Sequence, residues 1–137
     1  MNTCAELFVE SLKEKDLNFE SGTIKDGDSV VEFPYKGKVV KMFFSGEQGE
    51  YLSLYLVYEH VPAEKQMDTI MACNELNTAY KWVTFYVDRD NDVICHHDAI
   101  LTVENAAKEA LELLIRMVHI TIDDEDVKKA IMKAIYA

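Results

Sequence analysis

The stretch MDTIMACNELN (residues 67–77) is followed, with almost no loop, by WVTFYV (82–87), DRDND (88–92) and VICHHDAIL (93–101). Met67, Ile70, Met71 and Asn74 lie on one stripe of a helix, which we predict over about residues 62–79 with Pro62 in its first turn. The two apolar segments that flank the acidic turn predict a β-hairpin rich in aromatic residues. This helix and hairpin, residues 67–101, decide the fold.

The residues before this block predict one helix and then antiparallel strands. Thr3-Cys4-Ala5-Glu6 is a capping box that opens a helix over residues 4–16. Strands are expected at residues 18–24, 29–35 and 39–44, with a Lys36-Gly37 turn between the last two. In the next strand Leu52, Leu54 and Leu56 alternate with Tyr51, Ser53 and Tyr55, so the leucines are expected to face the core.

Two further helices are expected after the hairpin. Thr102 caps a helix over about residues 103–119, which is apolar around most of its circumference and must be covered on more than one side. One cover is a last helix that begins at Thr121 or Asp123, through its apolar residues Val127, Ile131 and Ile135. The other is a second copy of the chain, which would bury the surplus apolar surface in a two-fold dimer.

Together these elements predict an α+β fold in which helices pack on one antiparallel sheet. The expected order is α-β-β-β(-β)-α-β-β-α-α, in which the strand in brackets stands for residues 18–24. With 137 residues the chain is expected to form a single domain, 1–137, with residues 122–137 as an additional C-terminal helix.

The spacing of Asn74 and Asn77, on a helix that leads through Trp82 into a hairpin and another helix, resembles the YbjN family. The resemblance covers roughly residues 1–120 by the order of elements. It implies a fold like that of type III secretion chaperones and a place among bacterial sensory-transduction regulators. Those chaperones are homodimers that present a joint surface to an extended partner segment, so the resemblance also implies a protein partner and a possible homodimer.

Several residues are candidates for structural or interaction roles. Asparagine is a poor residue for a helix interior, so we interpret Asn74 and Asn77 as amides that stop the helix and hold the next segment. An aromatic sheet face is expected to draw on Tyr51, Tyr55, Tyr58, Trp82 and Tyr86, of which those opposite the leucines are the better surface candidates. The candidate interaction surface comprises Tyr51, Tyr55, Leu111 and Ile115.

The charge of the chain limits its partners. The formal net charge is −11 and no basic patch is visible, so binding to nucleic acid or to an anionic membrane is disfavoured. Cys4, Cys73 and Cys95 are odd in number and lack paired spacing, which indicates reduced thiols in a cytoplasmic protein. Glu6 and Glu10 interrupt the N-terminal apolar stretch, unlike in a signal peptide, and no apolar run reaches the length of a membrane span.

Cys95-His96-His97-Asp98 is the segment that most suggests chemistry. On a strand Cys95 and His97 share one face while His96 and Asp98 share the other, so each face offers at most two ligands, and tetrahedral zinc needs three or four. Cys95 and His97 as nucleophile and base lack a recognisable orienting residue. We therefore predict no enzyme activity and no cofactor or metal.

The resulting functional hypothesis is a non-enzymatic protein-interaction or regulatory domain that is chaperone- or adaptor-like. One alternative is a small metal-binding or enzymatic domain that uses the strand with His96 and His97. A second alternative is an acidic regulator that competes with nucleic acid for a basic partner.

Overall fold

The computed structural model describes residues 1–137. The helices are α1 (Thr3–Glu14), α2 (Gln66–Ala79), α3 (Ala106–Ile120) and α4 (Glu125–Tyr136). The strands are β1 (Glu20–Thr23), β2 (Ser29–Tyr35), β3 (Lys38–Ser45), β4 (Tyr51–His60), β5 (Thr84–Val87) and β6 (Asp92–Ile100). Short 3₁₀ turns at Ala63–Lys65 and Val103–Asn105 lead into α2 and α3. None of the helices has the length and apolarity that crossing a membrane requires.

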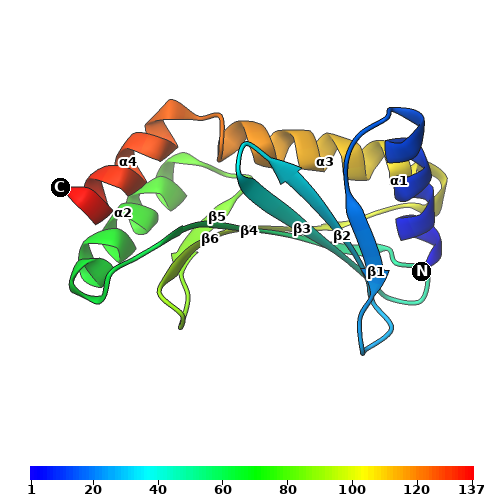
Figure 1. Cartoon of the computed structure of the whole chain (residues 1–137), viewed down its shortest axis with the longest axis horizontal. Coiled ribbons are helices and arrows are strands. Elements are labelled where there is room, and N and C mark those ends of the chain that lie inside the picture. The colour runs from blue at the N-terminus through cyan, green and yellow to red at the C-terminus, as the bar shows by residue number, and fades with distance from the viewer.

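All the strands belong to one antiparallel sheet of the order β1-β2-β3-β4-β6-β5. The helices α1 to α4 all lie on one side of this sheet (Figure 1). The opposite side, which we call the open face, has no helix on it. The predicted α+β class and the predicted order of elements, including the first short strand, are confirmed.

The core forms between the helices and the helix-facing side of the central strands. The register pairs Leu52 with Phe44, Leu54 with Met42 and Leu56 with Val40, and all six side chains are buried. Phe8 and Leu12 of α1 pack into the same cluster. The alternation of leucines and polar or aromatic residues in β4 therefore separates a core side from an open side, as predicted.

The predicted helix starts are wrong in three places, each for a local reason. Asn2 rather than Thr3 caps α1, because its Oδ1 accepts the N–H of Ala5 at 3.1 Å. The hydroxyl of Thr102 donates to Glu109 at 2.7 Å and makes no cap. Asp124, rather than Thr121 or Asp123, caps α4 by accepting the N–H groups of Asp126 and Val127.

The helix α2 turns a different side to the core from the one that its apolar stripe suggested. Met67, Ile70 and Met71 are exposed, whereas Thr69, Cys73 and Leu76 are buried. A buried threonine is tolerated here because its hydroxyl donates to the carbonyl of Lys65, in the 3₁₀ turn that leads into α2, at 2.7 Å. The apolar stripe of α2 is therefore a surface of the molecule.

The helix α4 does not seal the apolar strip of α3. Val127, Ile131 and Ile135 of α4 are buried, and α4 lies beside α2 (Figure 1). Ile115 of α3 remains 48% exposed, and Leu111 is half-buried. The cover that the sequence suggested for this part of α3 is therefore absent.

Candidate functional site

Asn77 ties the end of α2 to the edge strand β5. Its Nδ2 donates to the carbonyl of Phe85 at 2.9 Å, and its Oδ1 accepts the N–H of the same residue at 2.8 Å. The amide thereby satisfies both backbone groups of Phe85, much as a neighbouring strand would. Asn74, almost one turn earlier, is exposed. The segment that follows α2 is therefore held by Asn77.

We expect Asn77→Ala to lower the free energy of unfolding by about 2 kcal/mol, because two hydrogen bonds are lost and two backbone groups beside a buried ring lose their partner. Chemical denaturation of the purified variant measures this loss. Asn74→Ala is the matched control, since it removes the same amide from an exposed position of the same helix. Equal stabilities of the two variants would contradict the assigned role.

The strand β6 distributes its four reactive side chains over two faces. Cys95 and His97 face the helices, opposite Leu56 and Leu54 of β4, and His96 and Asp98 lie on the open face. Burial raises the pKa of the Cys95 thiol, which therefore stays protonated at neutral pH and is a poor nucleophile. Nowhere in residues 1–137 do three or more His, Cys, Asp or Glu side chains gather into a potential metal site.

His97 lies beside the ring of Trp82, with ring centroids 6.2 Å apart, and the guanidinium of Arg116 lies 4.6 Å from that ring. Burial lowers the pKa of His97 below its usual value of 6.5, and Arg116 lowers it further. The unfolded chain then binds more protons than the folded chain just below pH 6.5, so acidification favours unfolding.

We therefore expect the stability of the protein to fall as the pH is lowered from about 7.5 to about 5, and part of this fall to be absent in His97→Gln. Urea denaturation at several pH values in this range gives both profiles. Parallel profiles of the parent and the variant would show that His97 contributes nothing to the pH dependence.

On the open face, Phe43, Tyr55 and His96 form an aromatic cluster across β3, β4 and β6. The rings of Tyr55 and His96 stack with centroids 4.2 Å apart and planes inclined by 6°. Phe43 meets Tyr55 edge-on at 5.8 Å. Because the three side chains come from three adjacent strands, the backbone hydrogen bonds of the sheet hold the cluster in place.

The carboxylate of Asp98 lies next to this cluster, with its Oδ1 2.7 Å from Nε2 of His96. Burial alone would raise the pKa of Asp98, but hydrogen bonds with Ser53 and His96 outweigh burial and hold the pKa below its usual value. The side chain of Asp98 is 63% exposed, so a fixed negative charge stands at the edge of the aromatic cluster.

Apolar side chains extend the open face on both sides of the cluster. Val57, which is 51% exposed, pairs with the buried Ile94, and Ile94 pairs with the 36% exposed Tyr86 of the edge strand β5. At the other end of β4 the paired residues Tyr51 and Ile100 are 52% and 73% exposed. Contiguous exposed apolar groups of this kind mark interaction sites in soluble proteins.

The aromatic face differs in membership from the one expected. Tyr58 is buried, because it continues the alternation of Leu52, Leu54 and Leu56 along β4 and so faces the helices. Trp82 lies before β5 and contacts His97 and Arg116, also on the helix side. Phe43 and His96 were not anticipated as members, although each lies on the solvent side of the alternating pattern of its own strand.

A groove of about 400 Å³ runs between the end of α1, strand β2 and helix α3. Its apolar wall includes the predicted surface residues Leu111 and Ile115, together with Leu17, Phe33 and Val118. Lys15, His119 and Asp123 stand at the groove, so its charges are of both signs. Tyr51 and Tyr55 lie on the open face instead, so the four predicted surface residues belong to two separate sites.

Comparison with protein families identifies the chain. The YbjN family, described as "Putative bacterial sensory transduction regulator", matches residues 5–125. The chain belongs to the YbjN family. Asn74, Asn77, Trp82 and the whole open face lie within the matched residues, whereas α4 begins where the YbjN match ends. No curated protein matches the sequence.

A solved structure shares the fold of this YbjN-family chain. It is the Yersinia pestis type III secretion chaperone SycH in complex with a stable fragment of YscM2. The match has a TM-score of 0.53 and 15% sequence identity, and it covers 84% of this chain and 93% of the chaperone chain. The likeness to type III secretion chaperones is therefore one of fold, as predicted.

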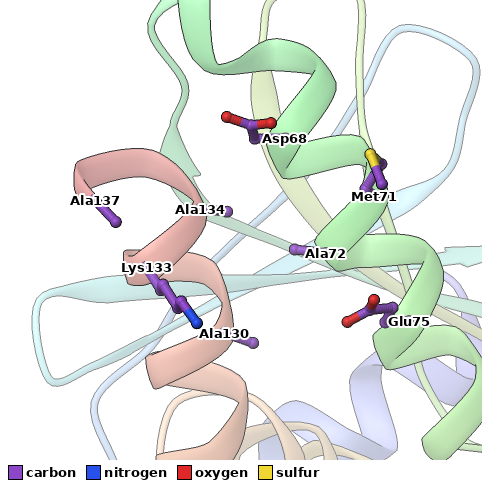
Figure 2. A pocket seen from close by; sticks show the side chains of 8 residues that line it. All are labelled: Asp68, Met71, Ala72, Glu75, Ala130, Lys133, Ala134 and Ala137. Atoms are coloured by element: carbon purple, nitrogen blue, oxygen red, sulfur yellow. The ribbon is translucent and has the colours of Figure 1, made fainter.

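A second groove, of about 490 Å³, lies between α2 and α4 and extends beyond the residues that match the YbjN family. Figure 2 shows Asp68 and Glu75 of α2 across from Lys133 of α4, with alanines of both helices between them. Met71 stands at its edge and connects it to the exposed apolar stripe of α2. This groove was not anticipated, because it depends on where α4 packs.

Proposed function

We propose that this chain is a non-enzymatic protein-interaction domain of the chaperone or adaptor kind, which acts in the bacterial cytoplasm in sensory transduction. The single observation that carries the proposal is the one-sided sheet, whose open face presents the aromatic cluster and exposed apolar side chains instead of a covering helix. Such a surface stabilises binding through apolar burial and shape. Residues 1–137 function together as one domain.

The family and the fold neighbour support this proposal. The family description names sensory-transduction regulators, and the solved chaperone binds a fragment of another protein. The chemistry of the described side chains also favours binding, since the most reactive candidate, Cys95, is buried in the core with a raised pKa.

Photo-cross-linking of the protein within living cells of its native bacterium tests the proposal. A photoreactive residue in place of Tyr51 would project from the open face, and one in place of Glu10 on α1 would project from the helix side. We expect a discrete protein adduct from position 51 that is absent from position 10. Adducts in equal yield from both positions, or none from position 51, would overturn the proposal.

We also propose that the chain is a homodimer joined through the groove with Leu111 and Ile115. Ile115 is 48% exposed and Leu111 beside it is half-buried, and a second copy of the chain would cover both. Because the groove carries charges of both signs, two copies meet there with fewer like-charge contacts than they would elsewhere on an acidic chain.

Sedimentation at micromolar concentration is expected to show a dimer for the parent chain and a monomer for Ile115→Glu, because the introduced carboxylate would be desolvated at the interface. Met71→Glu, on the exposed stripe of α2, is the matched control and should leave the dimer intact. Dissociation by Met71→Glu alone would place the interface on α2, and a monomeric parent chain would reject the dimer.

A further inference from the structure

We propose that the open face binds a polypeptide segment in which Lys or Arg side chains flank apolar ones. The inference rests on the proposed function, since it names the chemistry of the partner that the open face would receive. Three features of this face lead to it: the sign of its charges, the geometry of the aromatic cluster and the exposed apolar side chains beside the cluster.

The charged side chains of the open face are mainly acidic. Its strands carry Glu20, Glu32 and Asp98, while Lys41 is their basic residue and already lies 3.9 Å from Glu32. Most Lys and Arg residues of the chain instead belong to the helices or to the segments that flank them. The helices also carry more acidic than basic residues, so the sign of the charge alone does not separate the two sides; on the open face, however, a cationic partner meets a carboxylate beside aromatic rings.

Two acidic turns add to this charge. The β1–β2 turn contains Asp26 and Asp28 beside Lys25, and the β5–β6 turn contains Asp88 and Asp90 beside Arg89, so each turn has one negative charge in excess. Both turns project away from the helices, one on each side of the open face (Figure 1). A segment that lies across the sheet would therefore have carboxylates near both of its ends.

The aromatic cluster suits a cation at the centre of the face. The electron-rich faces of aromatic rings attract Lys and Arg side chains, and the stacked rings of Tyr55 and His96 lie beside the exposed carboxylate of Asp98. An arginine could stack on these rings while its guanidinium donates hydrogen bonds to Asp98. Apolar side chains of the same segment would cover Val57 and Tyr86.

The same charges disfavour two other occupants. Aromatic residues on an open sheet also stack nucleic-acid bases, but the phosphates would meet Glu32 and Asp98, and Lys41 is the one lysine that the strands place on this face. A second copy of the chain would bring two faces of the same sign together, each on a molecule of net charge −11. A basic partner segment is the occupant that matches both the rings and the carboxylates.

Fluorescence anisotropy with a synthetic peptide tests this inference. The probe is a labelled ten-residue peptide of alternating Arg and Leu, and its counterpart has Glu in place of Arg. We expect the Arg peptide to bind, the Glu peptide not to bind, and Asp98→Asn and Tyr55→Leu each to weaken binding about tenfold. Glu10→Gln removes one exposed carboxylate from α1 and is expected to change the affinity less than twofold.

The results separate a specific site from general attraction to an acidic protein. Equal weakening by Asp98→Asn and Glu10→Gln, with Tyr55→Leu unchanged, would show non-specific attraction and overturn the inference. Thermal melts show whether each variant is folded. If Tyr55→Leu is unfolded, the variant Asp98→Lys replaces it in the test. Unchanged binding of the Arg peptide to Asp98→Lys would reject the site. An acidic or neutral segment cross-linked at position 51 would leave the proposed function intact and reject only the inference.

Discussion

Gly49→Ala is expected to destabilise the protein by about 3 kcal/mol, which corresponds to a melting temperature lower by roughly 10 °C. Gly49 has a φ of 79°, a conformation that costs an alanine about 1 kcal/mol or more. The added Cβ would also overlap the amide of Asn2. That amide caps α1 through Ala5 and donates to the carbonyl of Phe44 at 2.7 Å, so its displacement breaks two hydrogen bonds.

The matched control is Gly37→Ala, at a φ of 81° where an added Cβ meets nothing within 4 Å. It carries the backbone strain without the displacement of Asn2, and about 1 kcal/mol is expected from it. Calorimetry of both variants separates the two contributions. If both lose the same stability, the contact between Gly49 and Asn2 does not fix α1 to the β3–β4 turn.

Ile131→Ala is expected to cost about 3 kcal/mol of folding free energy, because it leaves a cavity where a fully buried side chain of α4 meets the core. Lys128→Ala, on the exposed side of the same helix, is the control and should change stability by no more than about 0.5 kcal/mol. Urea denaturation curves of the two variants give the comparison.

The outcome for Ile131 decides how α4 relates to the rest of the molecule. A loss of about 3 kcal/mol in a single cooperative transition would make α4 part of the same folding unit as the sheet. If Ile131→Ala instead produces a separate transition at lower urea concentration, α4 unfolds independently of the sheet, although the side chains of Val127, Ile131 and Ile135 are buried.

The sequence predicted the fold correctly wherever a residue pattern was compatible with only one structure. Leu52, Leu54 and Leu56 alternate with Tyr51, Ser53 and Tyr55, and this period of two placed the leucines in the core and the tyrosines on the open face. Tyr58 lies at the same parity as these leucines and is buried with them, so the alternation itself excluded it from the aromatic face on which it was expected.

The helix α2 shows where periodicity fails. Its apolar residues define two stripes, one with Met67, Ile70 and Met71 and one with Cys73 and Leu76, and only the second is buried. The choice between them depends on Asn77, which must face β5 to reach Phe85, and on the self-satisfied hydroxyl of Thr69. Both constraints are hydrogen bonds, and the spacing of apolar residues along a helix carries no information about hydrogen bonds.

The candidate site was only partly predictable for a similar reason. Tyr51 and Tyr55 follow from the alternation in β4, but their joining with Phe43 and His96 requires the order β3-β4-β6. In that order β6 is the neighbour of β4, although α2 and β5 lie between them in the sequence. No local sequence pattern encodes this pairing.

The alternation of buried and open-face residues along β4 has an evolutionary consequence. Residues that stabilise the fold and residues on the open face alternate within the same strand, so a substitution at Tyr51, Ser53 or Tyr55 does not remove a side chain from the core that holds Leu52, Leu54 and Leu56. Natural selection on one set is therefore nearly independent of selection on the other. With the open face as the proposed binding surface, mutation of its residues can change which partner is bound, while the buried residues of the same strand preserve the fold.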